Sequence, residues 1–220
     1  MVIEILILLK NTCLFGDLLG SKVHKINVGK RSGNVYLYNK SIMIDAGMNP
    51  SRVLDGLKEF IKPEDLKIII LTHCHFDHFL AASRIKEKTG AKIYIHEDDS
   101  EYIETGDNVA TAAIFFGQEA PKIKPDSLLS NSDEIQDLKV IHTPGHTEGS
   151  ICLYDGEILF TGDTVFSNGR TGRTDLIGGD KNNLKHSLKK LSKLDVDKIY
   201  PGHGEISSGK SLKKAVERLK

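Results

Sequence analysis

The sequence contains no tryptophan, only three cysteines and no excess of charge of either sign. Cys13, Cys74 and Cys152 show no pairing pattern, which argues against a disulfide framework and suits a reducing cytosol. Thirty basic residues balance thirty acidic ones, so nothing indicates a nucleic-acid partner or an anionic membrane surface. The opening apolar run, residues 5–9, is too short to span a bilayer and follows Glu4 instead of a basic leader. We therefore expect no signal peptide and a cytoplasmic protein.

A chain of 220 residues with 39% hydrophobic content can form one domain with a substantial core. Strand-like and helix-like stretches alternate in both halves without a linker or a repeat, so we expect one α/β domain over residues 1–220. The expected strands are residues 2–9, 23–28, 35–37, 42–44, 68–71, 92–96, 138–141, 151–154, 158–160 and 198–200. The expected helices are residues 51–60, 79–88, a short one that ends near Gly106, 183–194, and one that begins near Ser211.

The most informative stretch is residues 72–78, with the sequence THCHFDH, which directly follows the apolar run 68–71. Imidazole and carboxylate groups packed this closely must be paired, charged or coordinated. Divalent metals favour this mixture of nitrogen and oxygen donors. Alternation along an extended segment points three of the donors to one face, namely His73, His75 and Asp77. The following turn can bring His78 beside them, so we interpret the stretch as a metal-binding motif.

Three further loops follow expected strands and combine a potential ligand with glycine or proline. They are HTPGHT at residues 142–147, TGDT at 161–164 and PGHG at 201–204. Each of the three alone is typical of a turn. Together with the stretch at residues 72–78, however, they make four loops with potential ligands, which favours one shared site. Two histidines at strand ends, His96 and His142, could orient a ligand through a hydrogen bond or be plain strand-end residues.

The ordered set THCHFDH, TPGHT, GDT and PGHG resembles the metallo-β-lactamase superfamily and covers nearly the whole chain. GRTGRTD at residues 169–175 and GGD at 178–180 resemble the glyoxalase II (hydroxyacylglutathione hydrolase) branch and its short relatives. The resemblance implies a four-layer αβ/βα sandwich of two mixed β-sheets flanked by helices, with ligands gathered at one edge. Full glyoxalase II enzymes add a C-terminal helical region that helps to hold glutathione. This chain ends about seventeen residues after His203, so no separate C-terminal glutathione-binding domain is expected.

The resemblance also implies two divalent metal ions, with zinc preferred and iron or manganese as alternatives. The implied ligands are His73, His75 and His146 for one ion, Asp77, His78 and His203 for the other, and Asp163 as the bridge. Two ions sharing a water would make hydroxide available near neutral pH and stabilise charge on a carbonyl oxygen. We therefore expect hydrolysis of a small thioester or ester, with Asp77 and Asp163 as catalytic carboxylates. A thioester releases an acidic thiol and needs little proton donation.

Two arginines and one long connection are candidates for substrate contacts. Arg170 and Arg173 follow Asp163 closely and could bind an anionic substrate group, although Arg173 could instead pair with Asp175. Residues 105–127 contain an apolar run with Phe115 and could form either a flap over the site or an ordinary packed loop.

Two other functional classes share these features. The runner-up is a mononuclear iron persulfide dioxygenase, a branch of the same superfamily that also has a GRTD segment, with its iron on His73, His146 and Asp163. A non-enzymatic metal-binding or redox-partner module would require a closed coordination shell. Balanced charge disfavours a ribonuclease-type member, and the GRTD segment disfavours a true β-lactamase. The sequence predicts no oligomeric state.

Overall fold

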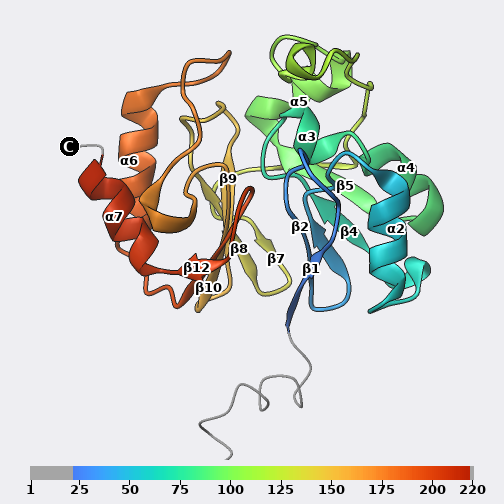
Figure 1. Ribbon diagram of the computed structural model, residues 1–220, viewed down its shortest axis with the longest axis horizontal. Helices are drawn as coiled ribbons and strands as arrows, with labels where there is room; N and C mark the ends of the chain where they lie inside the picture. The colour runs from blue at the N-terminus through green and yellow to red at the C-terminus, as the bar shows by residue number, and fades with distance from the viewer. Residues whose placement is uncertain (1–21, 219–220) are drawn as a thin grey trace, which may run out of the picture.

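The computed structural model describes residues 22–218 (Figure 1). The strand expected at residues 2–9 and Cys13 lie outside the described residues. In the described part of the chain, no helix combines the length and the apolar character that crossing a membrane requires.

Two six-stranded sheets, each with parallel and antiparallel pairs, form the centre of the molecule. The first sheet has the order β1 (Val23–Ile26), β2 (Val35–Tyr38), β3 (Ile42–Ile44), β4 (Ile68–Ile70), β5 (Lys92–His96) and β6 (Ser127–Leu129). The second has the order β12 (Ser207–Ser208), β11 (Lys198–Pro201), β10 (Ile158–Gly162), β9 (Ile151–Tyr154), β8 (Leu138–His142) and β7 (Glu134–Ile135).

Helices cover the outer faces of both sheets. Figure 1 shows α2 and α4 outside the first sheet and α6 and α7 outside the second, so that the two sheets face each other. The α-helices are α2 (Pro50–Lys58), α3 (Phe76–Phe79), α4 (Ala82–Thr89), α5 (Glu97–Thr105), α6 (Lys181–Leu191) and α7 (Lys210–Arg218). Short 3₁₀ turns are η2 (Pro63–Asp65), η3 (Ala113–Phe116) and η4 (Ser167–Gly169).

Alternation of apolar side chains along the strands builds the layers. In β2, Leu37 belongs to the core beneath α2 and α4, whereas Tyr38 belongs to the core between the sheets. In β10, Phe160 joins the same central core, and Leu159 points to the core beneath α6 and α7. Three apolar cores therefore separate four layers, which confirms the predicted sandwich.

Most of the predicted elements in the described part of the chain are present, with local differences. The N-terminus of α2 is capped by the Asn49 side chain, which accepts a hydrogen bond from Arg52 N at 3.1 Å. The helix predicted at 79–88 is observed as α4 and begins only at Ala82, because Ala81 N donates to Gly47 O and separates α4 from the short helix α3. The short strands β6, β7 and β12 were not predicted.

Candidate metal centre

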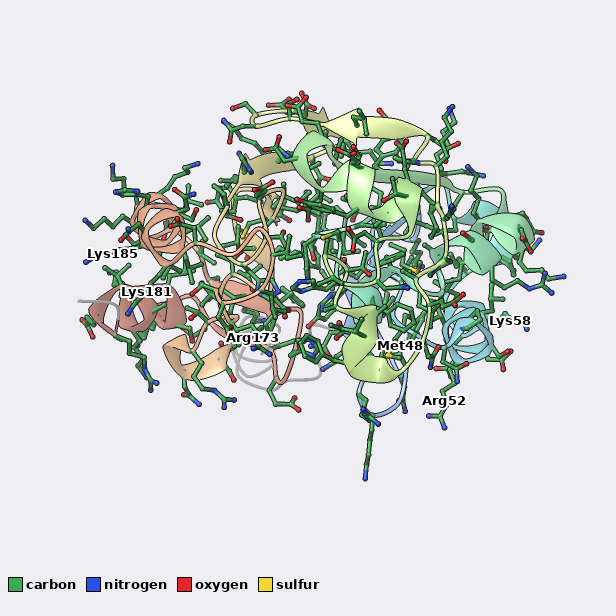
Figure 2. The ribbon with its side chains drawn as sticks, turned by 90° about the horizontal axis from the view of Figure 1, so that it is seen from above. Met48, Arg52, Lys58, Arg173, Lys181 and Lys185 are labelled. Atoms are coloured by element: carbon green, nitrogen blue, oxygen red, sulfur yellow. The ribbon has the colours of Figure 1, made fainter. Side chains whose placement is uncertain are left out.

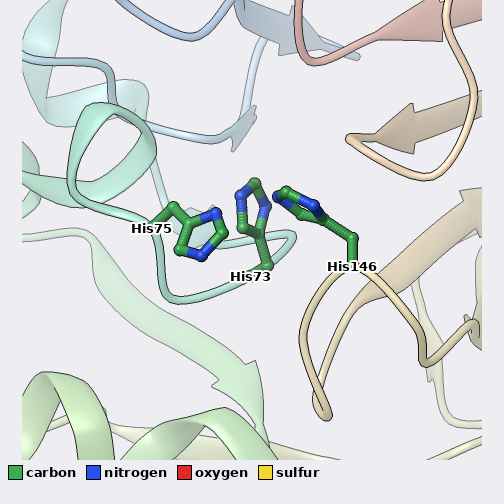
Figure 3. A group of neighbouring side chains, drawn as sticks. All are labelled: His73, His75 and His146. Atoms are coloured by element: carbon green, nitrogen blue, oxygen red, sulfur yellow. The ribbon is translucent and has the colours of Figure 1, made fainter. Parts of the chain in front are cut away.

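The four predicted loops lie together because the strands before them end at one edge of the sandwich. His73 and His75 follow β4, His146 follows β8, Asp163 follows β10 directly, and His203 follows β11. Figure 3 shows His73 and His75 projecting from one loop towards His146 on another. The sequence therefore placed these side chains together correctly.

Three of these histidines form the first cluster. Their ring centroids are 4.9 Å apart for His73 and His75, 4.8 Å for His73 and His146, and 4.5 Å for His75 and His146. Each Nε2 is buried and has no hydrogen-bond partner. His146 Nδ1 donates to Arg173 O at 2.8 Å, so Nε2 of the neutral ring keeps its lone pair. His73 Nδ1 lies 3.0 Å from Thr72 Oγ1. Three unpartnered nitrogen atoms thus point into one small space.

Asp77, His78 and His203 form a second cluster beside the first. His203 Nε2 lies 3.1 Å from Asp77 Oδ2 and 3.2 Å from His78 Nε2. Asp163 stands between the clusters, with Oδ1 at 3.5 Å from His78 Nε2 and Oδ2 at 3.6 Å from His146 Nε2. Within each of three overlapping triplets the donor atoms lie no more than 4.8 Å apart: His73, His75 and His146; His73, His78 and Asp163; Asp77, His78 and His203.

The electrostatics of the two clusters suit a bound cation. Burial and the neighbouring imidazoles lower the pKa values of His73 and His75 well below the usual value, so both rings are neutral and available as ligands. Burial opposes protonation of His78, but the carboxylates of Asp77, Asp45 and Asp163 raise its pKa to about 10. The carboxylates of Asp77, Asp45 and Asp163 thus lie close to buried donor atoms that have no hydrogen-bond partner. Both features fit divalent metal ions.

The helix α3 changes how residues 72–78 present their donors. Cys74 is buried with its sulfur 3.9 Å from Ala110 O, away from the clusters, as alternation predicted. Asp77, however, lies on the helical turn α3 and not on an extended segment, whereas His78 lies on a turn as predicted. Despite the cost of burial, His78 and His203 lower the pKa of Asp77, which keeps this carboxylate ionised.

Asp45 is a functional residue that the sequence did not single out. Its Oδ2 accepts hydrogen bonds from His78 Nδ1 at 2.8 Å and Thr72 Oγ1 at 3.0 Å. Its Oδ1 accepts one from Thr72 N at 2.8 Å. A carboxylate on the far nitrogen of a ligand histidine fixes the ring and its tautomer. In the sequence, Asp-Ala-Gly at residues 45–47 indicated only a turn.

Asp99, at the start of α5, is a second buried carboxylate that the sequence did not reveal. It has no exposed surface. Its Oδ2 accepts from Cys74 N and Thr147 Oγ1, both at 2.8 Å, and its Oδ1 accepts from Gly149 N at 2.7 Å. It therefore ties the loop of His73 and His75 to the loop of His146. Burial raises the pKa of Asp99, while the bonds from Thr147, Gly149 and Cys74 oppose this effect.

The GRTGRTD segment lies over the clusters. Gly172 N donates to Asp163 O at 2.8 Å, and a Cβ at this glycine would lie 2.7 Å from His146 Nδ1. Only glycine allows this approach. Arg173 forms two hydrogen bonds of 2.7 Å with Asp175, so the predicted pair is present, and its guanidinium lies 5.6 Å from the ring centroid of Phe115.

A cavity of about 470 Å³ opens above the clusters. Donor residues of both clusters form its polar side, and Arg170 and Arg173 lie on its wall. Its apolar side comes from the aromatic and aliphatic residues Ala112, Phe115, Phe116, Phe166 and Leu176. The run in residues 105–127 is therefore both packed and exposed: Phe116 lies against Phe76 with ring centroids 5.4 Å apart, whereas Phe115 is 55% exposed.

His96 and His142 form a separate pair. Their rings stack with centroids 4.0 Å apart, and Asp98 Oδ2 lies 3.5 and 3.6 Å from them. The nitrogens that face Asp98 already have hydrogen bonds: His142 Nε2 donates to Glu148 O at 2.8 Å, and His96 Nδ1 accepts from Asp98 N at 3.3 Å. His96, Asp98 and His142 are thus a separate, partly exposed group of potential donor atoms within 4.8 Å of one another.

The contacts of Asp99 generate a prediction. In Asp99→Asn the new amide would face a backbone N–H or the Thr147 hydroxyl, because all three partners donate. The two loops would shift, and affinity for Co²⁺ should fall roughly ten- to a hundredfold, as for other residues that support metal ligands. A Co²⁺ titration followed by visible absorption measures this. Glu101→Gln, at an exposed residue of the same helix outside the candidate donor groups, is the matched control. Wild-type affinity and spectrum in Asp99→Asn would refute the positioning role.

Comparison with known proteins agrees with this geometry. The profile of the metallo-beta-lactamase superfamily matches residues 28–203. The probable metallo-hydrolase MJ0888 of Methanocaldococcus jannaschii is 37% identical over 191 residues, which are 83% of this chain and 92% of that protein. Hydroxyacylglutathione hydrolase GloC of Haemophilus influenzae is 33% identical over 178 residues, 76% of this chain and 81% of that protein. The crystal structure of the BLEG-1 B3 metallo-beta-lactamase superposes with a TM-score of 0.77 and 30% identity, over 90% of this chain and 99% of that one. The chain belongs to the metallo-β-lactamase superfamily.

Proposed function

We propose that this protein is a metal-dependent hydrolase that holds two divalent ions and cleaves a thioester or ester. The observation that carries the proposal is the set of buried donor atoms without partners, His73 Nε2, His75 Nε2, His146 Nε2 and Asp163 Oδ1, at the floor of an open cavity. A closed structural site would leave no room for a substrate. The relative from M. jannaschii, named as a probable metallo-hydrolase, supports the same activity.

The donor geometry favours two ions over one. His73, His75 and His146 would hold the first, and Asp77, His78 and His203 the second. Asp163 would bridge them, because its carboxylate lies 3.6 Å from His146 of the first set and 3.5 Å from both His78 and His203 of the second. A single iron on His73, His146 and Asp163 would leave the buried Nε2 of His75 without a partner. Zinc is the preferred metal on the nature of the donors, with iron or manganese as alternatives.

The chemistry would be addition of water to an acyl carbon. Bound metal ions would lower the pKa of the attacking water and stabilise charge on the carbonyl oxygen. The water would lose one proton to solvent as its oxygen joins the acyl carbon, the carbon–sulfur bond of a thioester would break, and the sulfur would leave as a thiolate. The ionised Asp77 at the cavity floor is placed to accept a hydrogen bond from the attacking water. The apolar wall around Phe115 and Leu176 would hold the acyl group and exclude bulk water.

A thioester is favoured over other acyl compounds by one relative and by the leaving group. The relative from H. influenzae is named hydroxyacylglutathione hydrolase, and its substrate class is a thioester. Thiols are acidic enough to leave without a dedicated proton donor, and among the described residues that line the cavity the only imidazoles are those assigned to metals. Since a similar structure is that of a metallo-beta-lactamase, a β-lactam belongs among the control substrates.

The first prediction is the metal content. The loaded protein should contain close to two ions of zinc, iron or manganese per chain, because seven donors divide into two sets around Asp163. Mass spectrometry of the metals after gel filtration measures the ratio. Removal of the metals by a chelator should lower the melting temperature, because folding would then bury unpartnered donors. A ratio fixed at one, even after incubation with excess metal, would favour the single-iron alternative.

The second prediction compares variants of the two clusters. His146→Ala should abolish activity under either mechanism, because His146 would hold the metal common to both. His203→Ala should reduce thioester hydrolysis by orders of magnitude if two ions act together, while the first ion stays bound. Hydrolysis, oxygen uptake with a persulfide and β-lactam cleavage are measured side by side. Oxygen uptake that survives His203→Ala, in a protein without hydrolysis, would establish the dioxygenase instead.

The third prediction concerns Arg170 and Arg173, both proposed to contact substrate. Arg170 lies on the cavity wall, and within residues 22–218 it forms no ion pair, so it is available to an anionic substrate group. Arg170→Ala should raise KM for an anionic thioester about tenfold or more relative to a neutral thioester with the same acyl group. Arg173 is occupied by Asp175, so Arg173→Ala should affect both substrates alike. Equal losses with Arg170→Ala would show that this arginine does not recognise charge.

A further inference from the structure

A second cavity adjoins the one above the metal centre. It has a volume of about 910 Å³ and is formed by residues 27–32, Met48, Asn49, Arg52, Phe116 and Gln118. Phe116 lines both cavities. Its ring also lies against Phe76, which stands in the chain between two donor residues of the metal centre. A substrate longer than the first cavity could therefore continue past Phe116 into the second.

The walls of this second cavity are positively charged. Of the described residues that line it, three are cations, Lys30, Arg31 and Arg52, and none is a carboxylate. Throughout residues 22–218, none of the three forms an ion pair, whereas Lys58 on the same helix as Arg52 pairs with Asp55 at 2.9 Å. The first turn of α2 has no acidic residue, so the helix N-terminus adds partial positive charge. We name this cavity, with Lys30, Arg31 and Arg52, the cationic groove.

The groove is fixed to the metal centre by the residues that follow Arg31. Gly33 N donates to Asp77 O at 3.0 Å, and a Cβ at Gly33 would lie 2.6 Å from the His78 ring. Arg31 precedes Gly33 by two residues, so their Cα atoms are at most about 7 Å apart. Its guanidinium lies 5.9 Å from the Phe116 ring centroid. Ser32 Oγ accepts from Met48 N at 3.0 Å and ties the same loop to the start of α2.

We propose that the cationic groove binds the phosphate groups of the thiol half of an elongated thioester, of the coenzyme A class, while its carbonyl lies over the metal centre. This inference rests on the proposed hydrolase function. Guanidinium groups match phosphate oxygens in charge and in bidentate geometry. The thiol half of a glutathione ester carries an ammonium as well as carboxylates, and within residues 22–218 the lining of the groove includes no carboxylate to receive the ammonium.

The two halves of such a substrate would lie on different parts of the molecule. Figure 2 shows Met48 and Arg52 on one half, near α2, and Arg173 on the other. Arg170, in the same segment as Arg173, lines only the first cavity. The groove and the arginines of the GRTGRTD segment are therefore separate recognition elements, and each can be changed without touching the other.

The kinetic test uses one acyl group on three thiols. The metal-loaded full chain is assayed with acetyl esters of coenzyme A, glutathione and the neutral N-acetylcysteamine. Arg31→Asn suits the left-handed backbone at this residue, where φ is 66°. Arg31→Asn and Arg52→Gln should each lower kcat/KM for the coenzyme A ester, relative to kcat/KM for the N-acetylcysteamine ester, about tenfold or more. The main change should be a higher KM for the coenzyme A ester. Lys58→Gln, on the same helix but outside both cavities, is the matched control.

A binding measurement separates this inference from the proposed function. Calorimetric titration with desulfo-coenzyme A, which has no thiol to contact a metal, should show binding that weakens in both arginine variants but not in Lys58→Gln. Binding of this pattern without any thioester hydrolysis would uphold the groove and overturn the hydrolase. Two results would contradict phosphate binding in the cationic groove. One is hydrolysis in which both arginine variants keep the wild-type ratio of kcat/KM for the coenzyme A ester to that for the N-acetylcysteamine ester. The other is a fall in kcat/KM, relative to the N-acetylcysteamine ester, for the glutathione ester alone.

Discussion

The structure depends on one electrostatic constraint: seven histidine and aspartate side chains meet at one edge of the sandwich. Several of their donor atoms are buried without a hydrogen-bond partner. Burial of such groups costs free energy unless something replaces the lost water. Divalent cations would offset this cost for both clusters at once, since they accept lone pairs and neutralise the carboxylates around His78. The rest of the site is arranged to present these donors.

Support for the donors comes from residues that would not touch a metal. Asp45 fixes the ring of His78, the carbonyl of Arg173 fixes that of His146, and Asp99 holds two ligand loops together. Close backbone approach at Gly172 brings the GRTGRTD segment down onto Asp163. The same segment carries Arg170 into the cavity wall. The proposed substrate contact of Arg170 and the orientation of the His146 ring therefore depend on one segment.

The sequence predicted the four layers, the order of most elements and the gathering of seven histidine and aspartate side chains at one edge. These features could be predicted because each is encoded by a short, local sequence pattern. Strand-end glycines and a dense histidine motif are such patterns. Asp45 and Asp99 could not be found in this way, because their roles arise from partners about 30 to 50 residues distant in the chain. The break between α3 and α4 also depends on a distant contact, the bond from Ala81 N to Gly47 O. Short edge strands such as β7 carry too few residues for a periodic pattern.

We propose that two metal ions lie in these clusters with Asp163 between them. A crystal structure of the metal-loaded protein, with anomalous scattering measured at the absorption edge of the bound metal, tests it most directly. We expect two anomalous peaks about 3.5–4 Å apart, which is the usual separation of the ions in two-metal hydrolytic sites. One peak should lie among His73, His75 and His146, and the other among Asp77, His78 and His203. A single peak at full metal loading, or a second peak away from Asp163, would contradict it.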